Sequence, residues 1–358
     1  MRNKAESING LRVFHGIVNY GTQAGYIAKG LRVIGINARS YTIMDAFNRE
    51  TDFSFKKREN IFKKIFYYKI WYPLVKTWCI FNFDIFHFYY GTSLWPNQLD
   101  LPVIKFFGKK IVHHYLGHDV ELYKETIEKY EFSNMDFWAD EIKGSKHDII
   151  IKKRLKNELK FSDFQIVCSP HYYQFVPNST IIHLAIDTSK FEFTPLEYKD
   201  YSEEPVVIVH APTHRGVKGT QFLIEAVERL QNEGYFVELN ICEGIPHDIL
   251  LEEYKKADFS VASLLGGWFG TVGIEAMASG KGVISFLREE YLNHVEEEYK
   301  IDLPIVNANR DTIYDVLKHC LLNRNFKEWG KKSRLFVEKH HDMKIVAHQV
   351  NKIYETIK

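Results

Sequence analysis

Apolar runs of strand length alternate along most of this 358-residue chain with segments whose apolar residues recur at helical spacing. Residues 11–18 predict a first strand, and Ile27, Ala28, Leu31 and Ile34 mark one face of the helix that follows it. A glycine-containing loop separates the two, and a second apolar run comes after the helix. This order of strand, loop, helix and strand is the opening of a doubly wound α/β domain.

The second half alternates in the same way and ends in helices. Strands are predicted at residues 205–210, 237–242, 259–265 and 282–286. Helices are predicted at residues 220–231, 247–256, 271–279, 311–322, 327–340 and 343–357. Strands that alternate with helices indicate a parallel sheet.

A chain of this length suits two domains, each large enough to bury its own core. Residues 188–204 are polar and contain Pro195, which is typical of an interdomain linker. We expect the following parts: residues 1–187 as an N-terminal domain, 188–204 as the linker, 205–340 as a C-terminal domain and 341–358 as a final helix.

Charge and cysteine content narrow the class of protein. The net charge of +1 gives no global electrostatic basis for binding nucleic acid. The four cysteines are far apart and form no Cys-x-x-Cys pair, so we expect reduced core residues. The N-terminus lacks a secretory apolar region, and no apolar run reaches membrane-spanning length. These features predict a cytoplasmic protein.

Two segments, residues 206–220 and 264–286, hold the candidate chemistry. In each, an apolar run leads into a glycine-containing turn and then a helix, whose first N–H groups suit an anion such as phosphate. Arg215 and Lys218 would add two full charges at the first turn. In the second segment Gly270 and Thr271 open the helix. One turn further on, the carboxylate of Glu275 is able to accept hydrogen bonds from two sugar hydroxyls.

These segments resemble the nucleotide-binding half of retaining glycosyltransferases of family 4, which have the GT-B fold. The family places an Arg and a Lys on the donor diphosphate, which here match Arg215 and Lys218. It also has a Phe-Gly step before a Glu-Ala-Met-Ala-x-Gly segment whose Glu holds the ribose; Phe269, Gly270 and Glu275 match it. The resemblance implies two Rossmann-like domains facing a cleft and a C-terminal helix that crosses back to the N-terminal domain.

One position departs from the family pattern. The family has a further Glu eight residues before the ribose Glu, close to the transferred sugar, and this chain has Gly267 there. Binding of the donor diphosphate and ribose is still predicted, with Gly267 counted among the donor-binding positions. The absent carboxylate leaves the identity of the donor sugar, and catalysis itself, open.

The N-terminal half contributes weaker candidates. Gly21 and Thr22 lie in the first loop, which in the family faces the cleft, so we expect them near the donor phosphates or the acceptor; a plain structural turn is the alternative. Gly117 and Asp119 resemble a Gly-x-Asp step of the family. We expect His118 to point into the cleft beside Asp119 as a catalytic pair, although a buried, hydrogen-bonded histidine is nearly as good an explanation. The spacing of His and Cys does not predict a metal site.

Residues 55–83 interleave lysines and an arginine with Phe, Tyr and Trp. Such a segment suits peripheral contact with an anionic membrane, with aromatic rings at the depth of the headgroups. The alternative is a helix pair that packs its aromatic side chains inward and leaves the lysines in water, and the sequence slightly favours it. Membrane contact would place the protein at the inner face of the membrane.

From the resemblance we expect a glycosyltransferase of the hexosyltransferase type that retains anomeric configuration. It would move a sugar from a nucleotide-sugar to a glycan or lipid-linked acceptor, in surface polysaccharide biosynthesis, without a metal or other cofactor. Two other functions fit the same fold. One is a catalytically impaired scaffold, favoured by Gly267, and the other is a sugar-nucleotide epimerase, for which the sequence offers no convincing set of acid and base groups.

Overall fold

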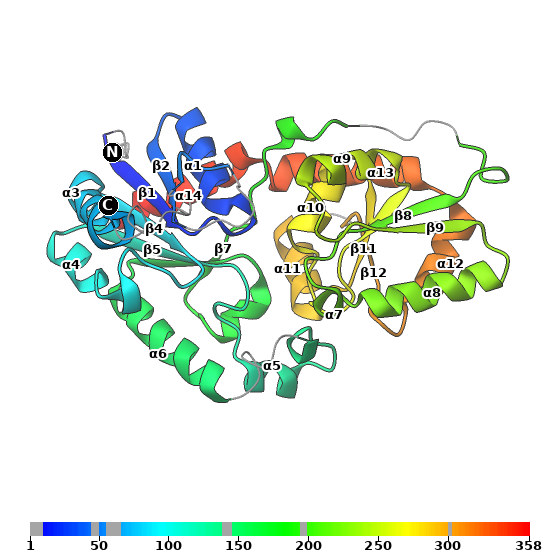
Figure 1. Cartoon of the computed structure of the whole chain (residues 1–358), viewed down its shortest axis with the longest axis horizontal. Coiled ribbons are helices and arrows are strands. Elements are labelled where there is room, and N and C mark those ends of the chain that lie inside the picture. The colour runs from blue at the N-terminus through cyan, green and yellow to red at the C-terminus, as the bar shows by residue number, and fades with distance from the viewer. Residues whose placement is uncertain (1–9, 44–49, 55–65, 138–144, 194–198, 300–302) are drawn as a thin grey trace. The chain divides into compact units, whose positions relative to one another are not determined.

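The computed structural model describes residues 10–43, 50–54, 66–137, 145–193, 199–299 and 303–358 of the chain (Figure 1). The chain divides into two compact units, which are described one at a time. Unit 1 spans Met1–Leu122, Asp148–Ile186 and Asp342–Lys358, and unit 2 spans Tyr123–His147 and Asp187–His341.

Unit 1 is built on a seven-stranded sheet in the order β3-β2-β1-β4-β5-β6-β7, in which every pair is parallel. Its strands are β1 (Arg12–Ile17), β2 (Asn37–Thr42), β3 (Phe53–Ser54), β4 (Ile85–Tyr89), β5 (Lys110–Tyr115), β6 (Phe164–Val167) and β7 (Thr180–Ile181). The central strands are buried on both faces, which explains their continuous apolar runs.

Helices cover both faces of this sheet. They are α1 (Gln23–Val33), α3 (Tyr72–Asn82), α4 (Leu101–Phe106), α6 (Ser145–Phe161) and α14 (Met343–Ile357). The last of these comes from the far end of the chain and packs along α1. Gly30 allows this contact, because a Cβ there would collide with the carbonyl oxygen of Met343. The predicted return of the C-terminal helix to the N-terminal unit is therefore confirmed.

Buried histidines and tyrosines tie α14 to the sheet. His87 Nδ1 lies 2.6 Å from the hydroxyl oxygen of Tyr354 on α14, and that oxygen lies 3.2 Å from His15 Nε2. His15 Nδ1 in turn contacts the hydroxyl of Tyr89 at 2.7 Å, and His87 Nε2 lies 3.3 Å from His114 Nδ1. All five side chains are fully buried. Burial lowers the pKa of His15 and that of His114 to about 3, so these rings are neutral in the folded chain.

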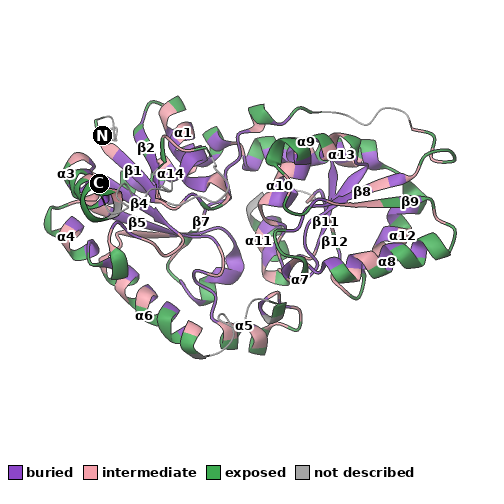
Figure 2. Ribbon diagram, viewed as in Figure 1, coloured by how far each residue is buried: buried purple, intermediate pink, exposed green. Residues whose placement is uncertain are grey.

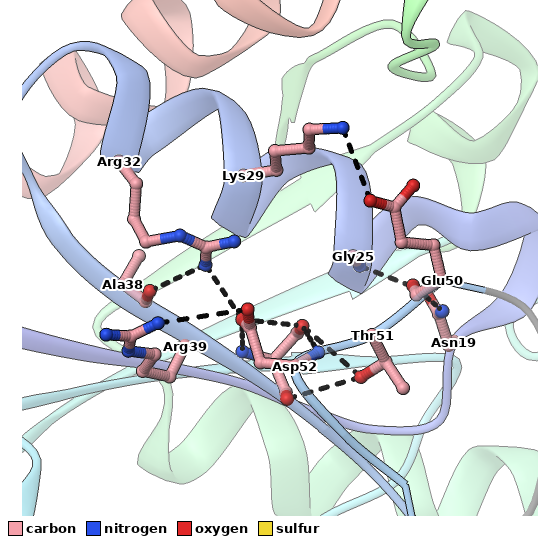
Figure 3. Close-up of polar contacts among 10 residues, drawn as sticks. Asn19, Gly25, Lys29, Arg32, Ala38, Arg39, Glu50, Thr51 and Asp52 are labelled. Atoms are coloured by element: carbon pink, nitrogen blue, oxygen red, sulfur yellow. Dashed lines mark hydrogen bonds and ion pairs between the residues drawn. The ribbon is translucent and has the colours of Figure 1, made fainter. Parts of the chain in front are cut away.

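A second polar network holds residues 50–52 against α1 and β2 (Figure 3). Asp52 Oδ2 accepts a hydrogen bond from Arg32 at 2.7 Å, and Arg39 lies 3.9 Å from Oδ1 of the same carboxylate. Asn19 Oδ1 accepts from the backbone N–H of Gly25 at 3.0 Å, and its amide donates to the carbonyl of Glu50. The contacts of Asp52 tie residues 50–52 to α1 and β2, and the contacts of Asn19 fix the loop between β1 and α1.

Unit 2 has a five-stranded parallel sheet in the order β12-β11-β10-β8-β9. Its strands are β8 (Val206–His210), β9 (Val237–Ile241), β10 (Phe259–Val261), β11 (Gly282–Ser285) and β12 (Ile305–Asn307). Its helices are α5 (Tyr123–Lys129), α7 (Arg215–Lys218), α8 (Thr220–Asn232), α9 (His247–Lys256), α10 (Gly270–Ala278), α11 (Glu289–Tyr299), α12 (Ile313–Asn323) and α13 (Phe326–His340). The predicted β/α alternation of this half is confirmed.

Residues 123–147 group with unit 2, although the sequence assigns them to the N-terminal domain. The hydroxyl of Tyr130 donates to Glu290 at 2.9 Å, and Lys129 lies 2.9 Å from the same carboxylate. The rings of Phe132 and Phe286 meet edge to face at 5.6 Å. These contacts join positions about 160 residues apart, so the local sequence pattern cannot predict that residues 123–147 belong to unit 2.

The four cysteines are unpaired and buried, as the sequence predicted. In the part of the chain that the structure describes, no helix combines the length and the apolar character needed to cross a bilayer.

Candidate functional site

The strongest candidates gather where β8 and β10 of unit 2 end. β8 leads into the short helix α7, which carries Arg215 and Lys218, and Gly219 then starts α8 in a left-handed conformation at φ +75°. The backbone N–H of Leu264, in the loop after β10, donates to the carbonyl of Lys218 at 3.0 Å. The two glycine-containing segments singled out in the sequence are therefore neighbours in space.

Lys218 points toward the start of α10. A Cβ built on Gly270, the first residue of that helix, would lie 3.9 Å from Lys218 Nζ. The ammonium group makes no hydrogen bond or ion pair with any described residue. Desolvation lowers the pKa of Lys218 to about 8, so the group is still mostly charged at neutral pH. A partly buried cation beside a helix N-terminus is suited to bind an anion.

Glu275 lies one turn into α10, and its carboxylate faces the first residue of α9. Glu275 Oε2 lies 3.4 Å from Nε2 of His247. The hydrogen bond to Glu275 raises the pKa of His247. Thr271 also lies in the first turn of α10, where backbone N–H groups have no partner within the helix. The sequence did not single out His247, but its position at the start of the helix after β9 was a usable signal.

Unlike Lys218, which points toward the start of α10, Arg215 forms an ion pair with Glu243. Its side chain is exposed, and Nε lies 2.7 Å from Oε2 of Glu243, which follows β9. At the end of β8, the buried ring of His210 contacts the carbonyl oxygen of Val261 at 2.7 Å and Thr220 Oγ1 at 2.8 Å. Burial lowers the pKa of His210 to about 4, so it adds no charge. Lys218 and, once released from Glu243, Arg215 are the available cations.

Gly267 is buried and left-handed, with φ +71°. The side chain of Arg288 lies directly over it, so that any Cβ at position 267 would collide with Arg288 Cγ. Arg288 is only 3% exposed, and its guanidinium carbon lies 3.9 Å from the centroid of the Tyr130 ring. A cation thus lies where the resembled family carries a carboxylate. The sequence missed Arg288, although its place just after a buried strand of the parallel sheet was a signal.

A pocket of about 480 Å³ adjoins this arginine at the carboxyl end of β11. It is lined by Lys129, Tyr130, Glu131, Phe132, Phe286, Arg288, Glu289, Glu290 and Asn293. Phe269, predicted as a donor-binding residue, instead lies fully buried with its ring 5.7 Å from that of Tyr291. Its side chain therefore supports the loop from inside the core.

In unit 1 the candidate pair His118 and Asp119 follows β5. Asp119 is buried, and its Oδ1 accepts from the backbone N–H groups of Leu116 and Gly117 at 3.1 and 2.8 Å. Oδ2 accepts no hydrogen bond from the described residues. Burial raises the pKa of Asp119 to about 7, an effect that the cation Arg154 partly offsets.

His118 does not share a hydrogen bond with Asp119 in the described structure. Its Nδ1 lies 2.9 Å from Oε2 of Glu121, whose other oxygen lies 3.5 Å from Nε2 of His171. Burial alone would raise the pKa of Glu121, but hydrogen bonds from the two histidines hold it well below its usual range. No local signal in the sequence pointed to His171, which lies 50 residues from Glu121, but sequence reasoning also overlooked Glu121, although this residue is only three positions after His118.

Gly21 and Thr22 form a tight turn at the end of β1. Both are left-handed, with φ +54° and +62°, and the side chain of Gln23 donates to the carbonyl of Gly21 at 2.8 Å. Beside the turn, the exposed ring of Tyr20 stacks on that of Tyr90 at 4.7 Å, and Tyr90 is itself left-handed. Non-glycine residues in this conformation are costly and cluster at functional sites.

Metal binding has little support in the residues described. None of their His, Cys, Asp and Glu side chains come together in groups of three or more that could hold an ion.

Comparisons with known proteins give the fold. No family model matches the chain, and no curated protein matches it in sequence. The structure is similar to sucrose-phosphate synthase from Thermosynechococcus elongatus, with TM-score 0.62, 16% identity, and 96% of this chain and 98% of that one covered. It is also similar to Anabaena HepE in complex with UDP and glucose, with TM-score 0.60, 12% identity, and coverage of 97% and 100%. WaaG, a glycosyltransferase of lipopolysaccharide biosynthesis, matches with TM-score 0.54, 13% identity, and coverage of 96% and 98%.

At these identities the likeness shows the fold. Two parallel sheets flanked by helices, matched along nearly the whole length of these structures, give the chain the two-domain α/β fold known as GT-B.

Proposed function

We propose that the protein is a glycosyltransferase that takes its sugar from a nucleotide-sugar bound by unit 2. The observation that carries this proposal is the cation of Lys218 beside the N-terminus of α10, with Glu275 one turn further along the same helix. This spacing suits a diphosphate at Lys218 and a ribose at Glu275. HepE, which shares the fold, was crystallised with UDP and with UDP-glucose.

In the proposed reaction, unit 2 stabilises the leaving group. Negative charge builds up on the diphosphate as the glycosidic bond breaks, and fixed cations and helix N–H groups aimed at that charge lower the barrier. Lys218 and the first turn of α10 supply them, and Arg215 joins when it leaves Glu243. No metal ion is needed in this scheme, because the protein cations perform its usual task.

Unit 1 is proposed to hold the acceptor. The rigid turn at Gly21 and Thr22 and the stacked pair of Tyr20 and Tyr90 lie at the carboxyl end of its sheet, where ligands of such sheets bind. An exposed tyrosine ring is suited to pack on the apolar face of a pyranose, which favours a glycan acceptor, free or lipid-linked. Retention of configuration and a role in surface polysaccharide biosynthesis are part of the proposal and rest on the family resemblance.

Nucleotide binding is the first test. UDP, GDP, ADP and CDP are added separately to the wild-type protein, to Lys218→Ala and to the control Lys331→Ala, and the melting temperature is measured. Lys331 is an exposed lysine of unit 2 that pairs with Glu328. A nucleotide at about 100 times its Kd should stabilise the folded state by about 2.7 kcal/mol. We expect one nucleotide to stabilise the wild type and the control but not Lys218→Ala.

Turnover is the second test. With the sugar donor of the selected nucleotide, Lys218→Ala should lose roughly 100- to 1000-fold in kcat, as removal of one transition-state donor usually does. Nucleotide binding without any transfer or donor hydrolysis would instead favour the scaffold, and a changed sugar on the same nucleotide would favour the epimerase. An EDTA-sensitive activity restored by Mn²⁺ would contradict the metal-free scheme. The anomeric configuration of the product, measured by NMR, tests retention.

A further inference from the structure

Helix α3 carries many exposed residues (Figure 2), and several of them are large and apolar. Leu74 is 59% exposed, Trp78 51% and Phe81 57%, at intervals of four and three residues that place them on one side of the helix. Phe106 and Phe107, at the end of α4, are 85% and 44% exposed. These five side chains are called the α3 face. Isolated exposed apolar residues are common, but a concentration of this kind marks an interaction site.

The α3 face is continuous across the two helices. The rings of Phe81 and Phe107 meet at 5.0 Å, and those of Phe106 and Phe107 at 5.5 Å. The opposite side of α3 is already used, because Cys79 and Ile80 lie in the core of unit 1. The helix is thus apolar on two sides. Residues 55–65 of the predicted basic and aromatic segment lie outside the described residues. In the described part, inward packing of the aromatic side chains is confirmed for Tyr72 and is wrong for Trp78 and Phe81.

Charge favours an anionic partner. Residues 60–83 contain four lysines and no Asp or Glu. Of these lysines, Lys69 is exposed on the turn before α3. Glu59 directly precedes this stretch and lies outside the described residues. The first two acidic side chains after it are already engaged: Asp84 lies 2.9 Å from Lys109, and the buried Asp100 accepts from Ser93 at 2.6 Å.

We propose that the α3 face docks on the surface of an anionic lipid bilayer. Trp and Phe side chains at headgroup depth, with lysine ammonium groups reaching the lipid phosphates, are the usual means by which an amphipathic helix lies in such an interface. A second copy of the chain is a poorer occupant. A twofold contact through this face would bring together two copies of residues 60–83, in which every charged residue is a lysine, without a matching acid in that stretch.

The proposal deepens the proposed function by giving a lipid-linked acceptor a place to meet the enzyme. It is tested without donor or acceptor, so its failure and the failure of the transferase proposal can be told apart. Flotation of the full-length protein is measured with vesicles of phosphatidylcholine alone and of phosphatidylcholine with 30% phosphatidylglycerol. Variants are Leu74→Ser with Phe106→Ser, the two most exposed positions, and the control Leu322→Ser with Leu335→Ser. Both control leucines are 66% exposed and lie on unit 2.

We expect the wild type and the control to float with the anionic vesicles, and the α3-face variant to bind at least tenfold more weakly. Binding of the wild type should fall at 0.5 M NaCl, because lysine contacts with phosphates are screened by salt. The proposal is overturned if the wild type stays with neither vesicle, if it binds neutral vesicles equally well, or if the variant floats like the wild type. It is also overturned if the wild type is a dimer that the variant converts to a monomer while vesicle binding is absent. Circular dichroism confirms that each variant is folded.

Discussion

In unit 1 the polar side chains of the central strands bind one another, whereas in unit 2 the cation that follows the central strand has no partner among the described residues. His15, His87 and His114 share hydrogen-bonding contacts with one another and with tyrosines inside unit 1. Lys218 in unit 2 instead faces the open start of α10. Hydrogen bonds among buried polar side chains favour one packed structure. A partly buried cation without a protein partner indicates that a bound anionic ligand is its partner.

The largest expected effect is on the stability of unit 1 in acid. Because burial lowers the pKa of these three histidines below the unfolded value of about 6.5, the unfolded chain binds more protons below that pH. The folded state therefore has its full stability above about pH 6.5, and its free energy of unfolding decreases as the pH falls below that value. Each should cost up to about 1.4 kcal/mol per pH unit, so by pH 5 the three together should cost several kcal/mol.

Urea unfolding at pH 7.5 and pH 5, followed by hydrogen exchange resolved by unit, measures this loss. Unit 1 should open well before unit 2 at pH 5. The variant His319→Gln is the control, since it removes an exposed histidine of unit 2 that pairs with Asn323. It should lose as much stability between pH 7.5 and pH 5 as the wild type. Equal acid sensitivity of the two units would contradict the contrast drawn between them.

The next largest effect concerns Gly267, where Arg288 occupies the space that a side chain would need. Gly267→Ala must adopt φ +71° and must also displace Arg288, so we expect a loss of about 3 kcal/mol in the free energy of unfolding. Gly234→Ala is a matched control: it has φ +89° but no atom within 4 Å of the new Cβ. It should lose only about 1 kcal/mol from backbone strain.

Chemical denaturation of both glycine variants gives the comparison. A difference of at least 1 kcal/mol between them would show that Arg288 is fixed over Gly267. Equal losses would mean that Arg288 moves aside easily, leaving room at position 267 for the carboxylate that the resembled family has there.

How far the sequence sufficed depends on how local each feature is. Helix α14 begins at Met343 and ends at Ile357 as predicted, because its apolar spacing is contained within the helix. Lys218 and Gly270 were singled out for a similar reason, since each lies within the short connection that leads from a strand into the next long helix. The partners of His118 and Arg288 were not found. Glu121 is only three residues after His118 and was overlooked, whereas His171 beside Glu121 and Tyr130 beside Arg288 are contacts between distant parts of the chain.

The burial of α3 shows a different limit. A helix with apolar residues on two sides does not specify which side enters the core. The sequence slightly favoured inward packing of the aromatic residues, but the core of unit 1 takes Cys79 and Ile80 and leaves Trp78 outside. Only the neighbouring strands and helices decide this, and they are set by the fold of the whole unit.

A smaller effect is expected when Lys218 loses its proton. Desolvation lowers its pKa to about 8, so above that pH the free protein holds less of the charged amine that a diphosphate requires. Affinity for the selected nucleotide diphosphate should fall up to tenfold per pH unit between pH 8 and 9.5, measured by calorimetry. Lys218→Arg should remove this dependence, because an arginine stays charged throughout the range. A wild-type affinity that does not change with pH would show that Lys218 does not bind the diphosphate.

The smallest expected effect tests whether Arg215 must leave Glu243 before it can bind the diphosphate. Arg215 and Glu243 are both exposed, and exposed ion pairs contribute at most about 1 kcal/mol, so Glu243→Gln should leave stability nearly unchanged. If Arg215 must leave Glu243 to reach the diphosphate, that variant should bind the nucleotide a few-fold more tightly. Glu328→Gln, which breaks the exposed pair with Lys331, is the control and should change neither quantity. Weaker nucleotide binding by Glu243→Gln would instead mean that Glu243 positions Arg215 for the nucleotide. Unit 2 would then resemble unit 1, in which polar side chains are held by contacts with one another.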